Sequence, residues 1–211
     1  MSLIRRLPSP ELVLHLTFDD GPASMGTRET LDLLRRHGVR ATFFLVAEKA
    51  RQNEGLVRAM VDEGHTLGNH SLDHRYGVFF RGTQAMKAWI EEAEQVFDAM
   101  GLPPRVGFRP PNGILTPKVF AAARELRKPL ILWNLRFYDS LWPWTRAKAE
   151  RALARLKPGS IVLLHDVQRP QNQKLFLETL EYFINESRRR GYRFEPLTLA
   201  ATSNQISPSE D

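Results

Sequence analysis

Two kinds of hydrophobic pattern alternate along this chain, and together they predict its fold class. Short runs rich in Val, Leu, Ile and Phe, such as residues 12–18 and 160–164, are typical of strands buried on both faces. Longer segments, such as 27–37 and 172–190, carry apolar residues at the three- and four-residue spacing of an amphipathic helix. Repeated units of this kind predict an α/β fold in which helices surround a mostly parallel sheet or barrel.

The same alternation continues through the rest of the chain. We expect further strands at 40–46, 106–108, 130–133 and 192–195, a third βα unit over 53–67, and helices that begin at Thr83, at about 117 and at Thr145. Thr27 and Thr83 are expected to cap their helices, because a threonine hydroxyl can accept a hydrogen bond from a free backbone N–H. Residues 1–11 are expected to form an N-terminal segment, 12–199 one domain and 200–211 a polar, flexible tail.

Composition narrows the possible chemistry. The 211 residues include 42% hydrophobic and 26% charged residues, which is ordinary usage for one globular domain. There is no cysteine, so disulfide scaffolds, cysteine-ligated metal centres and thiol nucleophiles are excluded. Any metal ion must therefore be bound by His, Asp or Glu.

Charge and hydropathy bear on partners and location. The net charge is +6, but the basic residues are scattered, and the one dense run, Arg188 to Arg190, is expected to be a solvated helix C-terminus. We therefore expect no nucleic-acid partner. We also expect a monomer. No apolar run reaches the roughly 18 residues of a membrane span, and the N-terminus lacks a signal-peptide core. The expected location is the cytoplasm for the chain as it stands, and the cell envelope or the exterior if it is processed from a longer one.

Ionisable side chains follow the carboxyl ends of several expected strands. They are Asp19, Asp20, His70, His74, Arg109, Asp139, His165 and Asp166. Because the carboxyl ends of parallel strands face one edge of a sheet or one mouth of a barrel, residues far apart in sequence can meet there. The pattern predicts a single site built from these residues.

Two histidines in this set have a spacing that suits a metal ion. His70 and His74 are four residues apart, which on a helical turn would bring their imidazoles close enough to share a cation. With one carboxylate they would form a ligand set for Zn²⁺ or another first-row divalent metal, with coordination positions left open. The spacing alone is also compatible with two histidines on a helix surface.

Asp19 and Asp20 are adjacent carboxylates between an apolar strand and Gly-Pro. They repel each other unless a cation or a donor divides their roles, so we expect one to bind metal and the other to act as a base. The alternative is a simple turn, which Asp-Gly-Pro favours by itself. Taken singly, His165 could likewise be a core histidine and Arg109 a structural ion-pair partner.

Four motifs occur in order along the chain: Thr17-Phe18-Asp19-Asp20-Gly21, His70-Ser71-Leu72-Asp73-His74, Arg109-Pro110-Pro111 and Leu163-Leu164-His165-Asp166. Together they resemble the motifs of the polysaccharide deacetylases, the NodB-homology metalloenzymes of carbohydrate esterase family 4. The resemblance extends over about residues 12–199. It implies an irregular (β/α) barrel of about seven units, fewer than those of the regular eightfold barrel.

The resemblance also implies the roles of the matching residues. Asp19 would be the general base and His165 the general acid. The metal ligands would be Asp20, His70 and His74. Zn²⁺ is the favoured ion, with Co²⁺, Ni²⁺, Mn²⁺ and Fe²⁺ as other candidates.

Further residues would support the reaction according to the same resemblance. Arg109 would orient Asp19, Asp139 would tune the catalytic histidine, and Leu163 would line the pocket for the acetyl methyl group. Asn112 stands where the family commonly has Tyr, but its backbone N–H would still be available to bind the oxyanion. The family's usual Trp directly after the tuning Asp is absent, and Trp142 is the candidate to replace it in the wall of the substrate site.

The expected function is removal of N-acetyl groups from N-acetylglucosamine residues of a polysaccharide, either peptidoglycan or a chitin-like glycan. Amide hydrolysis needs an activated water, a polarised carbonyl and a proton for the amine, and a divalent metal, Asp19 and His165 can supply them. One alternative is a cytoplasmic enzyme that deformylates or deacetylates a small or lipid-linked amino sugar. A second is a noncatalytic glycan-binding domain, whose signature would be a lost ligand or base. A third, a non-haem iron oxygenase, would leave the base and the acid without a function.

Overall fold

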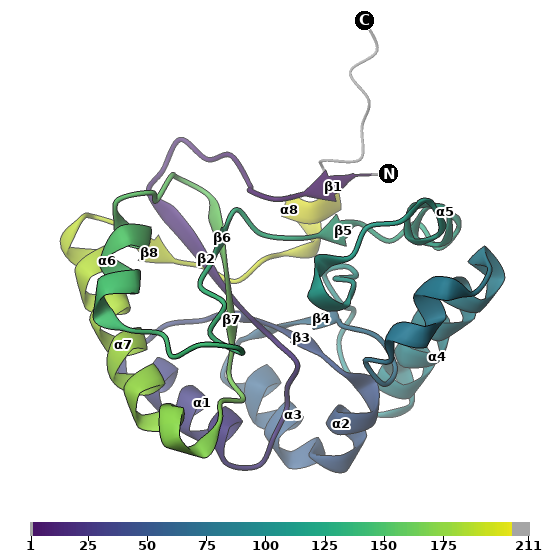
Figure 1. Ribbon diagram of the computed structural model, residues 1–211, viewed down its shortest axis with the longest axis horizontal. Helices are drawn as coiled ribbons and strands as arrows, with labels where there is room; N and C mark the ends of the chain where they lie inside the picture. The colour runs from purple at the N-terminus through teal and green to yellow at the C-terminus, as the bar shows by residue number, and fades with distance from the viewer. Residues whose placement is uncertain (1, 204–211) are drawn as a thin grey trace, which may run out of the picture.

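Strand β2 lies at the centre of a six-stranded sheet in the computed structural model, which describes residues 2–203 (Figure 1). The strands are β2 (Val13–Asp19), β3 (Thr42–Leu45), β4 (Thr66–Asn69), β6 (Leu135–Arg136), β7 (Ser160–His165) and β8 (Arg193–Phe194). Their order is β4-β3-β2-β7-β6, with β8 also paired to β2, and every pairing is parallel. Every residue of β2 is buried, including the polar residues His15, Thr17 and Asp19 that alternate with its apolar ones.

Single backbone bridges extend this sheet towards a ring. Strands β1 (Leu3–Ile4) and β5 (Leu130–Ile131) form a separate parallel pair. Phe108 bridges both Asn69 and Leu130, and Arg6 bridges Ser160. The strand expected at 106–108 is thus reduced to the bridges of Phe108. The result is an open, irregular α/β barrel, and the expected fold class is confirmed.

Helices surround the strands, as Figure 1 shows. They are α1 (Gly26–Arg36), α2 (Ala47–Gln52), α3 (Glu54–Asp62), α4 (Thr83–Ala99), α5 (Pro117–Glu125), α6 (Arg146–Leu153), α7 (Pro170–Arg189) and α8 (Leu199–Ser203), with 3₁₀ turns at Tyr76–Phe80 and Pro111–Gly113. Helix α7 ends within the exposed arginine run, as expected. None of the described helices combines the length and hydropathy that a membrane crossing requires.

An aromatic cluster in the core anchors the loop that follows β6. The rings of Phe137 and Trp144 stack with centroids 4.6 Å apart, and Trp144 also packs against Phe176 and Phe183 of α7. Trp144 is only 1% exposed. Because both ends of the loop are buried in this way, the aromatic cluster holds Asp139, which lies between them, in a fixed position.

The expected helix caps are wrong. Helix α1 has Met25 at its N-cap, and Thr27 lies inside the first turn. The Thr27 hydroxyl accepts a hydrogen bond from the Ala23 N–H and donates one to Asp166. Thr83 is the first residue of α4 rather than its cap. The sequence around Thr27 does not show that its hydroxyl binds the buried carboxylate of Asp166, which lies 139 residues further along the chain.

Both ends of the described chain pack onto the domain. Ile4 and Leu7 are buried, so the N-terminal segment contributes to the core. Residues 200–203, expected to belong to the flexible tail, form part of α8 instead, because the buried hydroxyl of Thr202 donates to the carbonyl of Val106. Residues 204–211 of that expected tail lie outside the described residues.

Candidate active site

The ionisable residues that follow the strands converge at the carboxyl end of the sheet, as expected. Asp19 ends β2 and pairs in register with His165, which ends β7. A cavity of about 370 Å³ opens beside them. Six of the residues singled out in the sequence line it: Asp19, Asp20, His70, Asn112, Leu163 and His165.

Asp20, His70 and His74 form a cluster that can hold a metal ion. The Nε2 atoms of His70 and His74 lie 3.2 and 3.0 Å from the same oxygen, Oδ1 of Asp20. One potential ligand atom from each residue lies within 4.8 Å of the other two. Burial raises the pKa of Asp20, but hydrogen bonds from His70 and His74, with the charges of His70 and His165, outweigh it and hold that pKa far below its usual range. The carboxyl is therefore ionised at neutral pH, as a metal ligand must be.

The hydrogen bond of His70 makes this cluster fit a cation. Its Nδ1 lies 2.7 Å from the backbone carbonyl of Arg109, which can only accept, so Nδ1 carries the proton. Without a metal ion, Nε2 can meet the Asp20 carboxylate only as a donor, which requires a second proton on the ring. A divalent cation can replace that proton, because the neutral ring presents a lone pair at Nε2 and the cation binds both this lone pair and the carboxylate.

The local structure around the two histidines differs from the expected helical turn. His70 follows β4 directly, and the segment to His74 is a loop in which Ser71 and His74 have positive φ, 88° and 61°. The Ser71 hydroxyl accepts a hydrogen bond from the N–H of His74, and the Asn69 side chain accepts one from the N–H of Ser71. These side-chain contacts, rather than helical periodicity, bring the imidazoles together.

Loss of both histidines should remove the metal site. We expect His70→Ala/His74→Ala to bind divalent metal at least about 10-fold more weakly than wild type, because two of three ligands are gone. Elemental analysis after dialysis measures this, with His37→Ala, whose ring instead contacts Glu181, as the control that should keep wild-type metal content. Stoichiometric metal in the double variant would contradict the assignment.

Asp19 is held by a fully buried arginine. Nη1 of Arg109 lies 2.7 Å from Oδ1 of Asp19 and also donates to the hydroxyl of Thr17. The guanidinium donates further to the carbonyls of Ile131 and Leu132, so its orientation is fixed from several sides. This geometry leaves Oδ2 of Asp19 facing His70, 3.8 Å from its Nε2, and brings Arg109 and Asp19 together as expected.

Asp139 orients the imidazole of His165. Its Oδ1 lies 3.0 Å from Nδ1 of His165, and its Oδ2 accepts from the His165 backbone N–H at 2.7 Å and from the side chain of Gln168. Burial lowers the pKa of His165, but the charge and hydrogen bond of Asp139, with the charges of Asp19 and Asp20, outweigh it and raise that pKa to about 9. The ring is therefore protonated at neutral pH and directs Nε2 towards Asp20.

A second buried aspartate, Asp166, supports the loop that carries Asp20. It accepts a hydrogen bond from Thr27, whose hydroxyl in turn binds the N–H of Ala23. A Cβ at Gly21 would meet the Asp166 carboxylate at 2.8 Å, so only glycine allows this close approach. Burial raises the pKa of Asp166 to about 6, against the smaller opposing effect of the Thr27 hydrogen bond.

This raised pKa predicts a pH-dependent stability difference. A carboxyl whose folded pKa is raised contributes stability below its unfolded pKa and loses it as the pH rises through the folded value. Relative to Asp166→Asn, the wild type should therefore lose up to about 3 kcal/mol of unfolding free energy between pH 4 and 6. Urea unfolding of the metal-free proteins measures the gap, with the exposed Asp62→Asn as control. A gap that does not change with pH would refute the prediction.

Several residues that line the cavity were not predicted from the sequence. They are Tyr76, Trp133, Arg136, Tyr138, Ser140 and Leu141. Arg136 and Tyr138 alternate with buried Leu135 and Phe137, and this two-residue period was a usable signal. Tyr76 accepts a hydrogen bond from the side chain of Asn112, which connects two loops of the site.

Trp142 does not occupy the expected position in the wall of the site. Its side chain is 66% exposed and does not line the cavity. The backbone N–H of Trp142 bonds to the carbonyl of Tyr138, and the resulting turn directs Ser140 and Leu141 to the cavity instead. The tryptophan of this region that is buried is Trp144, which belongs to the core.

Comparison with known proteins agrees with this geometry. The family model described as "Polysaccharide deacetylase" matches residues 6–130. The chain is 32% identical to the peptidoglycan-N-acetylglucosamine deacetylase of Bacillus cereus, over 89% of this chain and 87% of that protein. It is 35% identical to PgdA, the corresponding enzyme of Listeria monocytogenes, over 85% of this chain but only 36% of that longer protein.

A solved structure supports the same relationship. The Bc1960 peptidoglycan N-acetylglucosamine deacetylase superposes with a TM-score of 0.82 at 28% identity, over 93% of this chain and 91% of that one. The fold, the ordered motifs and the sequence relatives therefore agree. The chain belongs to the polysaccharide deacetylase family.

Proposed function

We propose that this protein is a metal-dependent hydrolase that removes N-acetyl groups from N-acetylglucosamine residues of peptidoglycan or a chitin-like glycan. The observation that carries the proposal is the meeting of Asp19, His165 and the ligand cluster around Asp20 in one cavity. A noncatalytic glycan-binding domain would have no need for the complete set. The relatives described above act on peptidoglycan, which supports this class of substrate.

The ligand cluster would hold the ion through Asp20, His70 and His74. When bound, a divalent metal supplies Lewis-acid polarisation of the scissile carbonyl. Asp19 would accept the proton of the attacking water as general base. Its bond to the buried Arg109 keeps the carboxylate oriented, so that the base needs no reorganisation during the reaction.

His165 would donate the proton that the departing amine requires. Asp139 engages Nδ1, so Nε2 is the nitrogen available on the side of the cavity. The raised pKa of His165 keeps that proton in place at neutral pH. An acid and a base of opposite protonation state in the same cavity are what amide hydrolysis needs.

Two further residues would determine how the acyl group fits. Leu163 lies on the cavity wall and is 6% exposed, so its side chain would limit the acyl group to a small one such as acetyl. Asn112 lines the same cavity, and we assign its backbone N–H to the oxyanion.

Mass spectrometry of glycans tests this function. N-acetylglucosamine oligomers, peptidoglycan fragments and N-formylated small and lipid-linked amino sugars are each incubated with the zinc-loaded protein. Fragmentation identifies each sugar that has lost an acyl group. We expect loss at N-acetylglucosamine residues. Loss of a formyl group from a small or lipid-linked amino sugar, with none from the polymers, would contradict the proposal.

A further inference from the structure

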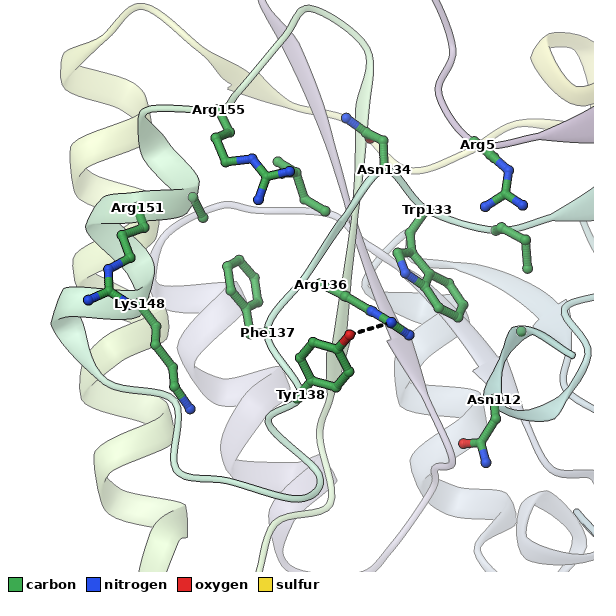
Figure 2. Close-up of a pocket in the computed structure, with 14 residues that line it drawn as sticks. Arg5, Asn112, Trp133, Asn134, Arg136, Phe137, Tyr138, Lys148, Arg151 and Arg155 are labelled. Atoms are coloured by element: carbon green, nitrogen blue, oxygen red, sulfur yellow. Dashed lines mark hydrogen bonds between the residues drawn. The ribbon is translucent and has the colours of Figure 1, made fainter.

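A second cavity, of about 630 Å³, adjoins the candidate active site and is strongly basic (Figure 2). We call it the basic groove, after its cationic lining residues Arg5, Arg136, Lys148, Arg151 and Arg155. No Asp or Glu is among the described residues that line it. The basic groove shares walls with the active-site cavity, at Asn112, Trp133, Arg136 and Tyr138. A chain-like ligand can therefore occupy both.

The groove is built by the edge strand of the sheet and the helix that follows it. Arg136 extends from β6, whose neighbour Leu135 is buried. Lys148 and Arg151 are three residues apart on α6 and so share one face of the helix, and Arg155 lies in the turn just beyond its end. In Figure 2 these three side chains come from one side of the groove, and Arg5 lies on the opposite side.

The cations of the groove lack counter-ions among the residues that the structure describes. None of the five takes part in an ion pair there, whereas Arg146 on the same helix pairs with Glu150 at 3.3 Å. Arg136 lies over the ring of Tyr138 and donates a hydrogen bond to its hydroxyl. Positive charges gathered in a concave surface raise the local concentration of anions.

We propose that the basic groove binds anionic substituents of the substrate, so that the preferred substrate is a glycan with carboxylate or phosphate groups beside the acetylated sugar. This inference rests on the proposed function. Guanidinium groups bind both carboxylate and phosphate in bidentate geometry, so the shared chemistry is that of an oxyanion. Trp133 and Tyr138, at the boundary of the two cavities, offer aromatic surface to the sugar rings between the charged group and the reacting amide.

Matched oligosaccharides separate charge from shape. The first substrate is a neutral N-acetylglucosamine oligomer. The second has equal length, but in it N-acetylglucosamine alternates with the lactyl-ether sugar of peptidoglycan, which carries a carboxylate, and the third is the methyl ester of this second oligomer. The fourth is an N-acetylglucosamine oligomer that carries phosphate groups. We expect a higher kcat/KM for the free carboxylate than for its ester, with an advantage that shrinks as salt is added. The phosphate oligomer shows whether carboxylate or phosphate is the better anion.

The variant Lys148→Gln/Arg151→Gln/Arg155→Gln removes three charges from the groove. Exposed charge pairs are each worth a few-fold at most, so we expect the ratio of kcat/KM between carboxylate and ester to fall about 10-fold.

The matched control is Arg36→Gln/Arg51→Gln/Arg124→Gln, which removes the same charge from exposed residues outside both cavities and should keep the wild-type ratio. Equal ratios in the two triple variants would overturn the proposal.

Isothermal titration calorimetry measures the affinity of the protein for the same oligomers, so this test of the basic groove does not depend on turnover. Binding that favours the carboxylate over its ester in wild type, and loses that preference in the groove variant, would support the groove even if no acetyl were released. That outcome would overturn the proposed function alone. Binding without any dependence on charge would overturn the groove, whatever the turnover on neutral oligomers.

Discussion

Asp19→Asn is expected to lower turnover by about 100- to 10,000-fold while metal content stays at the wild-type level. The amide cannot take a proton from water, but its oxygen can still accept the hydrogen bond of Arg109. Asp20→Asn, one residue away, should instead lose metal, because its carboxylate faces both histidines. Elemental analysis and steady-state rates on the same preparations measure both effects.

The two variants Asp19→Asn and Asp20→Asn therefore serve as controls for each other. Thermal unfolding of the two variants shows whether either has lost its fold, which matters because Arg109 is a buried charge. If Asp19→Asn loses the metal and Asp20→Asn keeps it, the two roles are reversed. If both keep the metal and near-normal rates, neither aspartate belongs to the chemistry.

His165→Ala is expected to lower turnover by about 100-fold or more without displacing metal, which is the usual scale for a positioned acid. Catalysis requires Asp19 ionised and His165 protonated together, so kcat/KM should have a bell-shaped dependence on pH. Its upper limb should lie where His165 loses its proton, at a pH that the charge and hydrogen bond of Asp139 raise. Activity should thus fall as the pH rises through that value.

The variant Asp139→Asn tests whether the titration of His165 causes the upper limb of the pH profile. The variant removes an anion that stabilises the imidazolium, so the upper limb should move to lower pH. Profiles of wild type and variant are compared with one substrate and one metal, because each limb is a macroscopic value of a coupled site. An unmoved limb, together with near-normal activity in His165→Ala, would remove His165 from the mechanism.

The sequence located the site because parallel strands end at one edge. Asp19 and His165 are far apart along the chain, yet β2 and β7 place them opposite each other in register. The order of apolar runs was enough to predict that these residues meet at one end of the sheet, since polar residues mark the ends of the buried strands, but the pairing of β2 with β7 comes from the structure.

Loop conformation could not be predicted in the same way. Asp20, His74, Asn112 and Tyr138 all have positive φ, between 54° and 71°. Such conformations are rare for residues other than glycine, and at His74 a specific side-chain contact, the hydrogen bond of its N–H to the Ser71 hydroxyl, accompanies the positive φ. The helical turn expected around His74 failed for this reason.

The sequence also could not show which of two neighbouring tryptophans is buried in the core, because packing between distant segments decides it. Trp142 and Trp144 both follow Asp139 closely, and only packing against Phe137 and the aromatic residues of α7 places Trp144 in the core. The basic groove was missed because Arg5, Arg136 and Arg155 lie on three separate segments. Basic residues that are far apart along the chain therefore come together in the folded protein and line one cavity.

The central claim is that the cavity around Asp19 hydrolyses the acetamido group of a glycan with the help of a bound metal. Its most direct test is the paired measurement of acetate released and free amine formed from an N-acetylglucosamine glycan by the zinc-loaded protein. We predict equal amounts of the two products, loss of both on chelation, and recovery when metal is restored. A folded protein with a full complement of metal that releases no acetate from any such glycan would contradict the account.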